Sequence, residues 1–467
     1  MKPQPSSLAD SLYGAQTKMA IQNFPISGLK LPIEFIQAVV HIKQAAAIVN
    51  RQLGLLDKQK SRAISVAAQE VIGDQHTDQF PIDIFQTGSG TSTNMNVNEV
   101  IATRAQQLLG EQSSLRIHPN DHVNLGQSSN DVIPSAIHLA ALGAIQTDLV
   151  PALSLLREEL AKKARAFDRL MKIGRTHLVD ATPIRLGQEF GGYARQIQLA
   201  ARRIKQASID LEELPLGGTA VGTGLNTHPE FAARVIQRLA KQTKLPLREA
   251  RNHFEAQSAK DAIVSVSGSL KSLAISLIKV ANDIRWLSSG PRAGLGEITL
   301  PSLQPGSSIM PGKVNPVLCE SVLQVAAQVI GADTTITLAA SLGSSFELNT
   351  MMPIMAFRLL ESINILSNVT RLFATKCVAG IQANKDRCQQ SVEQSLALVT
   401  SLAPTIGYDA ATSIAKEALK TGETIREVAR RQTKLTEIEL TQLLDPWPMT
   451  EPGIISNKNV QDNKPGL

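Results

Sequence analysis

Polar, glycine-rich segments interrupt an otherwise aliphatic sequence, and they hold the side chains best suited to chemistry. Small hydroxyls, amides and backbone N–H groups concentrate in them, and such groups bind anions through many directed hydrogen bonds. We therefore expect a small anionic ligand. The segments are TGSGTSTNMNVN (87–98), HPNDHVNLGQSSND (118–131), GRTHLVD (174–180), GGTAVGTGLN (217–226) and GSSIMPGKVNP (306–316).

The glycine-based phosphate motifs do not fit these segments. Gly306 and Gly312 enclose five residues where a P-loop has four, and Val314 stands where that motif needs Ser or Thr. The segments around 88–90 and 217–224 lack the strand and helix that flank a dinucleotide-binding fingerprint. We expect no cofactor.

A metal site is not expected either. His118 and His122 have the spacing of zinc ligands on a helix, but Pro119 lies between them and the sequence offers no obvious third ligand. We therefore expect no metal ion in the site.

The cysteines and the apolar runs predict a cytoplasmic protein. Cys319, Cys377 and Cys388 are too few and too scattered for a disulfide framework, which favours a reducing compartment. Residues 1–14 contain no apolar core of signal-peptide length, and no uninterrupted apolar run approaches the ~18 residues that span a bilayer. We expect no membrane contact.

The net charge of +6 does not indicate a nucleic-acid partner. A nucleic-acid groove interleaves basic residues with stacking aromatic ones, and aromatic residues make up only 3% of this chain. We interpret the basic clusters at 202–205 and 430–434 as solvated helix faces.

Long helical patterns dominate the chain, which is 43% hydrophobic. One apolar seam alternates steps of three and four residues along a single helix. Ile275 and Ile278 lie off that seam, so we expect the helix to be buried on two sides, as in a homotetramer whose central helices pack together. The seam consists of Ile263, Val266, Leu270, Leu273, Leu277, Val280 and Ile284.

These patterns predict an all-α fold in three domains. A first domain at 1–127 has shorter helices, including 32–53 and 58–72, and a third at 389–467 is small and helical. Between them, 128–388 is expected to form a bundle of long helices. The bundle helices are expected at 135–167, 186–214, 263–284, 319–342 and 355–381.

The segment GSSIMPGKVNP closely resembles the signature loop of the fumarase and aspartase superfamily, whose members eliminate water or amines from succinyl compounds to release fumarate. The resemblance covers nearly the whole chain and implies a three-domain fold whose central bundle forms the core of a tetramer. Relatives usually carry a longer, charged lead-in before YGAQT, so we expect either a looser first domain here or a different choice of start site. Further matching segments are YGAQT (13–17), SGPRAGLGEI (289–298), FELN (346–349) and GYDAA (407–411).

Within the superfamily, the sequence is most similar to class II fumarase, the iron-free enzyme that interconverts fumarate and L-malate in the tricarboxylic acid cycle. Residues 128–131 read SSND and 217–219 read GGT, where aspartate ammonia-lyases typically have STND and GAT. Val317 and the IQAN at 381–384 resemble aspartase instead. Aspartate ammonia-lyase is therefore the alternative, and a non-enzymatic structural member, like the lens proteins of the superfamily, is a weaker one.

The implied reaction needs a group that stabilises a carbanion. Removal of a C3 proton beside a carboxylate drives charge into that carboxylate and gives a doubly negative aci-carboxylate. Lys313, with Asn315 as a neutral donor, suits this role because a fixed charge gains most where negative charge develops.

The resemblance implies that Ser307 is the base and acts as an oxyanion. A serine hydroxyl is ordinarily too weakly acidic, but loop N–H groups and the nearby Lys313 would stabilise the anion and lower its pKa. From the residues alone, Ser307 and Ser308 are equal candidates for base or turn residue.

The resemblance also implies that His177 pairs with Glu320. A carboxylate partner holds the imidazole in one tautomer and supports its positive charge, which suits the leaving hydroxyl or the second carboxylate. Which proton His177 handles stays open.

Short neutral donors fit the carboxylate and hydroxyl groups of such a substrate. Ser128 or Asn130 also fits the N-cap of the following helix, and a helix start is itself an anion site. The expected substrate-binding residues are Ser89, Thr91, Ser128, Ser129, Asn130, Thr176 and Asn315.

Two further implications of the resemblance concern more distant parts of the assembly. His118, Asn120 and Asp121 match a second dicarboxylate site of some fumarases, although Leu115 stands where that site usually has Arg. Each active site is expected to draw on three chains. Thr91 and 128–130 come from one chain, His177 from a second, and Ser307 and Lys313 from a third.

Overall fold

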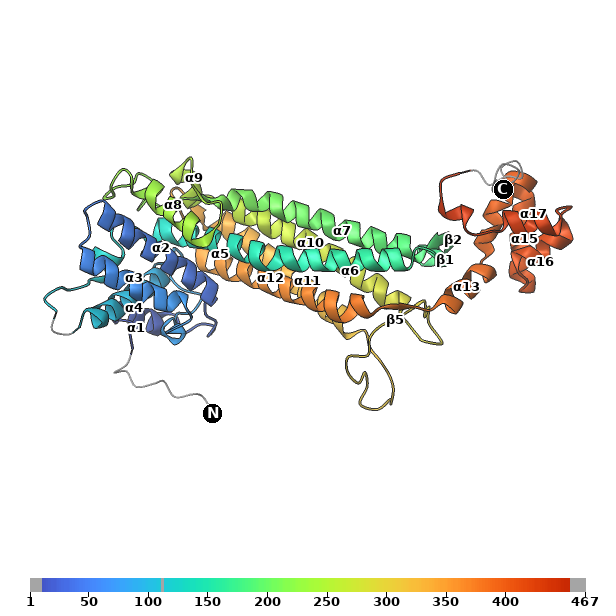
Figure 1. Ribbon diagram of the computed structural model, residues 1–467, viewed down its shortest axis with the longest axis horizontal. Coiled ribbons are helices and arrows are strands. Elements are labelled where there is room, and N and C mark those ends of the chain that lie inside the picture. Colours follow the sequence, from blue (N-terminus) through green and yellow to red (C-terminus); the bar gives the residue numbers. More distant parts are fainter. Residues whose placement is uncertain (1–10, 111–112, 454–467) are drawn as a thin grey trace, which may run out of the picture. The chain divides into compact units, whose positions relative to one another are not determined.

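The computed structural model describes residues 11–110 and 113–453, and Figure 1 labels its elements. Helices dominate, and the strands of the described residues form only two-stranded sheets, which confirms the all-α prediction. The chain divides into two compact units that alternate along the sequence. Unit 1 is 1–152, 200–275 and 324–368, and unit 2 is 153–199, 276–323 and 369–467. The domain boundaries expected near 127 and 388 stay predictions.

The N-terminal helices of unit 1 pack around α2, which contacts α3, α5 and α8 (Figure 1). Asp57 caps α3 because its side chain accepts hydrogen bonds from the backbone N–H groups of Gln59 and Lys60. The helices expected at 32–53 and 58–72 are confirmed. The bounds are α2 (Ile33–Gln52), α3 (Lys58–Ile72), α4 (Thr91–Leu109), α5 (Ser129–Ala144), α8 (Phe231–Thr243) and α9 (His253–Ser258).

The YGAQT segment is tied firmly to unit 1 by Glu99. The Glu99 carboxylate accepts hydrogen bonds from Gly14 N at 2.8 Å, Thr17 N at 3.2 Å and Thr17 Oγ1 at 2.6 Å. These bonds hold the start of α1 (Ala15–Asn23) on α4. Whether the first domain is looser than in relatives stays a prediction, and residues 1–10 lie outside the described part of the chain.

The long helices contribute residues to both units. The seam predicted on α10 is buried along its whole length, which confirms it, whereas Ile275 is 55% exposed on another face. Helix α6 continues α5 through a π-helical turn, Ile145–Leu149. The bounds are α6 (Val150–Ala166), α7 (Leu186–Ala207), α10 (Asp261–Leu287), α11 (Val317–Gly343) and α12 (Met352–Leu372).

Helix α11 carries a second uncovered apolar face that the sequence patterns did not single out. Leu338 is 52% exposed and Leu342 is 74% exposed, and Phe346, just beyond the helix, is 93% exposed. Gly331 and Ala327 are exposed about two and three turns before Leu338. Large apolar side chains in such a row indicate a surface that is covered by another molecule.

The expectation that no segment has the composition of a membrane span is wrong. Ser129–Ala166, Asp261–Leu287 and Val317–Gly343 are long and apolar enough to cross a bilayer, with 50%, 50% and 33% of their most apolar windows buried. Isolated polar residues interrupt the apolar run in each of these helices. A search for uninterrupted apolar runs therefore misses the high mean hydropathy of the helices.

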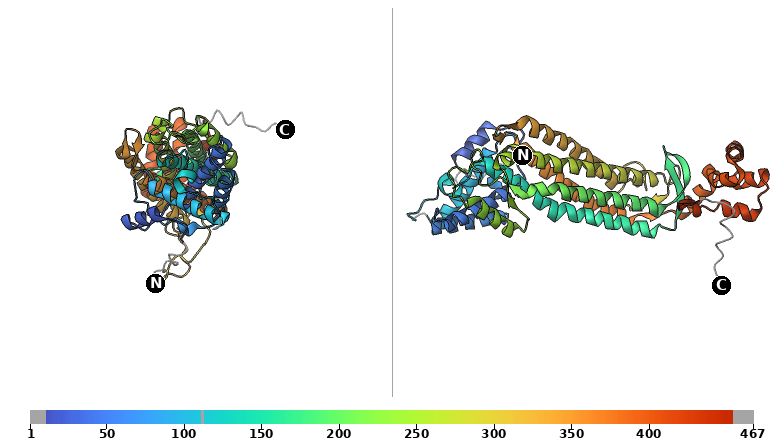
Figure 2. Two further views of the ribbon diagram at one scale, coloured as in Figure 1. Left: turned by 90° about the vertical axis from the view of Figure 1, so that its left-hand side faces the viewer. Right: turned by 90° about the horizontal axis from the view of Figure 1, so that it is seen from above.

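The C-terminal helices of unit 2 surround a small aliphatic core that includes Leu402, Ile414, Val428 and Leu440. They form a compact group in the right-hand view of Figure 2. Capping boxes begin two of them, at Thr424 and Thr436. The polar tail expected after Pro452 lies almost wholly outside the described residues. The bounds are α13 (Lys385–Gln394), α14 (Ala403–Ile406), α15 (Tyr408–Thr421), α16 (Ile425–Gln432) and α17 (Glu437–Leu443).

The segment GRTHLVD is the turn of a β-hairpin and not the plain loop that its composition suggested. Strands β1 and β2 pair antiparallel, with Thr176 opposite Val179. Sequence periodicity missed the hairpin because each strand is short and carries charged residues. The strand bounds are β1 (Met171–Thr176), β2 (Val179–Arg185), β3 (Glu213–Leu214), β4 (Arg248–Glu249), β5 (Ile298–Thr299), β6 (Ser344–Ser345), β7 (Leu348–Asn349) and β8 (Gln382–Ala383).

We expect His138 to make the fold sensitive to acid. Its Nδ1 lies 2.8 Å from the carbonyl oxygen of Glu213, and burial lowers the pKa of His138 to about 4. An unfolded histidine titrates near ~6.5, so the unfolded chain binds more protons between these values and stability falls as the pH falls through them.

His138 alone should contribute a loss of about 2 kcal/mol in the free energy of unfolding between about pH 7 and about pH 5, whereas Asp131, whose pKa burial raises to about 6, acts in the opposite direction over this range. Urea titrations at these two pH values, at one protein concentration, measure it. The change in stability between the two pH values should differ by about 2 kcal/mol between the wild-type protein and the His138→Gln variant, and an identical pH dependence in the two proteins would show that His138 does not contribute.

Candidate active site

A chain of hydroxyls joins three of the expected substrate-binding residues in unit 1. Ser89 Oγ lies 2.8 Å from Thr91 Oγ1, which lies 2.7 Å from Ser129 Oγ. Thr91 is the first residue of α4 and Ser129 the first of α5. Two helix N-termini therefore meet at this cluster, and each attracts negative charge.

Glycines allow the loop before α4 to approach its neighbours closely. A Cβ atom on Gly88 would lie 1.7 Å from the carbonyl oxygen of Thr350. Gly90, at the N-cap of α4, has a φ of 73°, which is left-handed backbone that favours glycine. The glycines at these two positions thus set where Ser89 and Thr91 lie.

Ser128 is the N-cap of α5, which confirms one of the two roles expected for it. Its Oγ accepts a hydrogen bond from Asn130 N at 3.2 Å, and Asp131 Oδ1 accepts one from Ser128 N at 2.9 Å. Asn130 Nδ2 donates to the carbonyl oxygen of Ala220 at 2.8 Å. The start of α5 is therefore joined to the segment 217–226.

In unit 2, His177 occupies a strained two-residue turn between β1 and β2. His177 and Leu178 have φ values of 57° and 59°, so both lie in the left-handed region that side chains usually avoid. His177 and Thr176 are exposed. Strain of this kind persists where surrounding structure enforces it, commonly at functional sites.

A buried carboxylate anchors this hairpin. Glu297 is fully buried and lies 2.7 Å from Arg175 Nη2 and 3.2 Å from Lys172 Nζ, both on β1. Lys172 Nζ also lies 3.4 Å from Glu189. These ion pairs fix the strand that ends one residue before His177. The acidic residue within the matched segment SGPRAGLGEI was a signal that the sequence offered and that we did not use.

The loop 306–316 is folded around Ser307. Ser307 Oγ accepts hydrogen bonds from Ile309 N at 3.2 Å and Met310 N at 2.9 Å. These are the N–H groups that would stabilise an oxyanion on this oxygen. The Ser308 side chain makes no hydrogen bond within the described residues, so the geometry distinguishes two serines that the sequence left equal.

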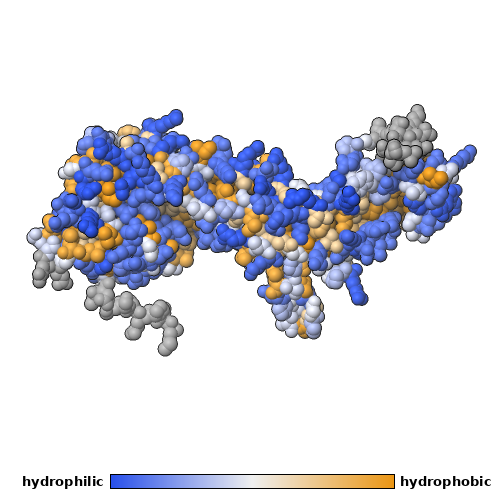
Figure 3. Space-filling model, in the orientation of Figure 1, coloured by the Kyte–Doolittle hydropathy of each residue, from blue (hydrophilic) through white to orange (hydrophobic). Residues whose placement is uncertain are grey.

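The ends of this loop are held together, while its lysine remains free. Gly306 N donates to the carbonyl oxygen of Lys313 at 2.8 Å, and Asn315 Nδ2 donates to the carbonyl oxygen of Gly306 at 2.7 Å. Within the described part of the chain, the exposed Lys313 side chain has no hydrogen bond or ion pair. Ile309 is 84% exposed, and Figure 3 shows apolar surface on the loop that follows β5.

The structure does not pair His177 with Glu320 in one chain. Glu320 lies in the first turn of α11 and is half-buried. Neither side chain makes a hydrogen bond or ion pair among residues 11–110 and 113–453. A partner for either group must come from elsewhere in an assembly, or the expected pair does not form.

The sequence matches family models over most of its length. A model described as "Lyase" matches residues 5–331, and one described as "Fumarase C C-terminus" matches 398–451. A fumarate hydratase class II from Halobacterium salinarum is 54% identical over 96% of this chain and 95% of its own length. One from Nitrosomonas europaea is 51% identical over 95% and 96%.

The chain belongs to the class II fumarate hydratase family. Solved structures agree with this assignment. The class II fumarase of Schistosoma mansoni has a TM-score of 0.92 at 40% identity and covers 95% of this chain and 96% of its own. A fumarate lyase:delta crystallin from Brucella melitensis bound to cobalt has a TM-score of 0.90 at 43% identity, with the same coverage. The family's all-α, three-domain fold is therefore the fold of this chain.

The second dicarboxylate site of some fumarases stays a prediction in this member of the family. His118, Asn120 and Asp121 are exposed at a π-helical turn, Pro119–Val123. Lys60 Nζ lies 2.8 Å from His122 Nε2 and so brings a cation to this turn. In the described residues, no three His, Cys, Asp or Glu side chains are grouped to hold a metal ion.

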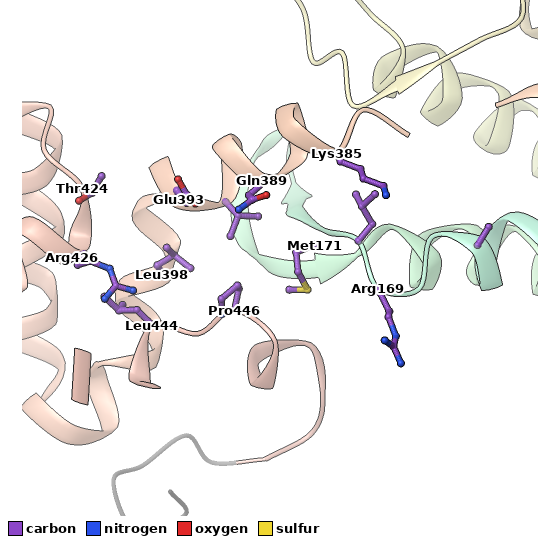
Figure 4. Close-up of a pocket in the computed structure, with 13 residues that line it drawn as sticks. Arg169, Met171, Lys385, Gln389, Glu393, Leu398, Thr424, Arg426, Leu444 and Pro446 are labelled. Atoms are coloured by element: carbon purple, nitrogen blue, oxygen red, sulfur yellow. The ribbon is translucent and has the colours of Figure 1, made fainter. Parts of the chain in front are cut away.

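A pocket of about 640 Å³ in unit 2 lies apart from the expected site residues (Figure 4). Its floor is apolar and includes Met171, Leu398 and Leu444, and Lys385 and Arg426 are among its polar lining residues. None of the residues predicted to bind or transform the substrate lines it. The predicted site residues belong to both units, with those at 89–130 in unit 1 and those at 176–177 and 307–320 in unit 2.

Proposed function

We propose that the chain is a fumarate hydratase that interconverts fumarate and L-malate. The observation that carries this proposal is the 54% identity over 96% of the chain to a class II fumarate hydratase. The local geometry of Ser307 supports it, because two backbone N–H groups point at the oxygen that must become an anion.

In the proposed elimination, Ser307 removes a proton from C3 of L-malate. The N–H groups of Ile309 and Met310 stabilise the serine oxyanion that does so. The negative charge moves into the neighbouring carboxylate, where the ammonium group of Lys313 stabilises it. Asn315 holds the loop closed through its hydrogen bond to the carbonyl oxygen of Gly306. The C3 proton and the C2 hydroxyl leave from opposite faces, and the hydration of fumarate is the reverse, an anti addition.

Neutral donors hold the substrate during these steps. The hydroxyls of Ser89, Thr91 and Ser129, at two helix N-termini, suit the carboxylate that does not react. His177, supported by Glu320, serves the leaving hydroxyl or a substrate carboxylate. The remaining proposed contacts come from Ser128, Asn130 and Thr176.

We propose a homotetramer with each site shared between three chains. Support comes from His177 and Glu320, which have no partners within the described chain, and from the exposed apolar face of α11 with Leu338 and Leu342. Ile275 of α10 is exposed as well. Packing α10 and α11 against copies of themselves would cover these surfaces.

The same packing accounts for the helices with the composition of membrane spans. Lys271 Nζ on α10 lies 2.6 Å from Asp333 Oδ2 on α11, and Ser267 Oγ donates to Asp333 Oδ1 at 2.8 Å. Charged residues are costly in a bilayer, so these helices suit a protein interface better than lipid. We propose a cytoplasmic enzyme.

The proposed enzyme should prefer L-malate to L-aspartate. Ser129 offers a hydroxyl where ammonia-lyases use Thr, and Gly218 replaces their Ala. Differences of one methyl group are worth only about 1–3 kcal/mol, so we expect a specificity constant for malate about 10- to 100-fold above that for aspartate. Fumarate absorbance with each substrate measures both constants. A constant for aspartate equal to or above that for malate would favour the ammonia-lyase alternative, which Val317 and the IQAN segment support.

A further inference from the structure

A fully buried carboxylate lies beneath the cluster proposed to bind the substrate. Asp131 Oδ1 accepts a hydrogen bond from Ser128 N at 2.9 Å. Its Oδ2 accepts bonds from Gly217 N and Thr219 N, each at 3.0 Å. The two oxygens therefore bind different segments, the start of α5 and the loop 217–226. The Asp131 side chain thus sets the distance between these two segments.

The loop that Asp131 holds has little freedom of its own. Thr219 is 6% exposed and has a φ of 55°, which is a rare conformation for a β-branched residue. Gln257 Nε2 donates to the carbonyl oxygen of Thr219 at 3.1 Å, and a Cβ atom on Gly218 would lie 2.1 Å from Gln257 Oε1. Such backbone persists only where hydrogen bonds enforce it, and Asp131 supplies two of them.

A buried lysine provides the charge that balances Asp131. Lys43 is fully buried, and its Nζ donates to Asn124 Oδ1 at 2.7 Å. Asn94 Nδ2, on α4, donates to the same oxygen at 3.2 Å. Burial lowers the pKa of Lys43 to about 7, although the charge of Asp131 opposes this shift. The network thus reaches α2, α4, α5 and the loop 217–226.

We propose that Asp131 is a positioning residue of the active site, with its carboxylate fixing the proposed substrate contacts Ser128–Asn130 against the loop 217–226. This inference rests on the proposed fumarate hydratase function. Asp131 has no exposed surface and acts through the residues that it orients. Asp131 accepts three hydrogen bonds from backbone N–H groups, and these bonds use both of its oxygens. Only a side chain with a hydrogen-bond acceptor at both positions can therefore replace it.

The test is Asp131→Asn, which keeps the shape but turns one oxygen into an N–H donor that faces another donor. We expect KM for L-malate and the dissociation constant of succinate, a non-reacting dicarboxylate, to rise by about 10- to 100-fold, with a smaller change in kcat. The matched control is Asp333→Asn. Asp333 is also buried, and its hydrogen bonds go to Ser267 and Lys271 and not to the start of α5 or the loop 217–226, so this variant should lose stability and keep KM.

A double variant separates positioning from stability and remains informative if Asp131→Asn alone does not fold. Asp131→Asn with Lys43→Met removes both buried charges, which commonly restores stability after one partner is lost. We expect its Tm to recover while its KM and its succinate dissociation constant stay high. Recovery of binding together with Tm, or a wild-type KM in Asp131→Asn, would overturn the inference. Failure of the wild-type protein to convert L-malate would overturn the proposed function and the inference with it.

Discussion

Ser307→Ala should lower kcat for L-malate by about 10²- to 10⁴-fold, the range typical of a lost general base. The dissociation constant of succinate should change little, because Ser307 acts when the proton moves and binds little of the ground state. We choose this serine for its geometry, because Ser307 Oγ accepts hydrogen bonds from the backbone N–H groups of Ile309 and Met310 at 3.2 and 2.9 Å.

Two further variants show whether this loss belongs to Ser307 alone. Ser308→Ala is the matched control, since Ser308 is the adjacent, exposed hydroxyl in the same loop, and it should turn over at nearly the wild-type rate. Lys313→Ala should lower kcat and also weaken the binding of succinate, because a cation beside a carboxylate stabilises negative charge in both the ground state and the transition state. Near-normal turnover in Ser307→Ala would move the search for the base to Ser308.

Mixing two inactive variants should restore activity if each site is shared between chains. His177→Asn and Ser307→Ala are unfolded together and refolded as a mixture. A working site then needs its histidine from the Ser307→Ala chain and its serine from the His177→Asn chain. With equal and random mixing, this occurs in about one half times one half, or about one quarter, of the sites.

The refolded mixture is compared with each variant refolded alone, which should stay inactive. Mixed tetramers are verified by mass, with one variant carrying an affinity tag. If His177 and Ser307 of one site came from the same chain, no mixed site would contain both. Activity indistinguishable from the single variants, in tetramers shown to be mixed, would refute the shared site.

The sequence predicted the parts of the fold that depend on local pattern. The seam from Ile263 to Ile284 is buried as expected, because a repeat of three and four residues specifies one helix face. Ser128 caps α5 as its residue type suggested. The family also followed from contiguous motifs, above all residues 306–316, whose letters need no knowledge of tertiary contacts.

Contacts between distant segments were beyond a single sequence. The ion pair between Glu297 and Lys172 and the hydrogen bond between Asp131 and Gly217 join residues that are far apart in the chain, and no sequence periodicity predicts such contacts. The exposed face of α11 went unnoticed because its small and polar residues dilute the apolar pattern around Leu338. The hairpin at His177 was missed because its strands are short and carry charged residues, and because its turn uses left-handed residues other than glycine.

The most direct test of the proposed reaction is the hydration of fumarate in D₂O by the purified protein treated with a metal chelator. Proton NMR of the product shows where deuterium enters and in which configuration. We predict L-malate with one deuterium at C3 and a single diastereomer, as anti addition requires, and almost no product from Ser307→Ala. Formation of no malate, or of both C3 diastereomers in equal amounts, would contradict the account.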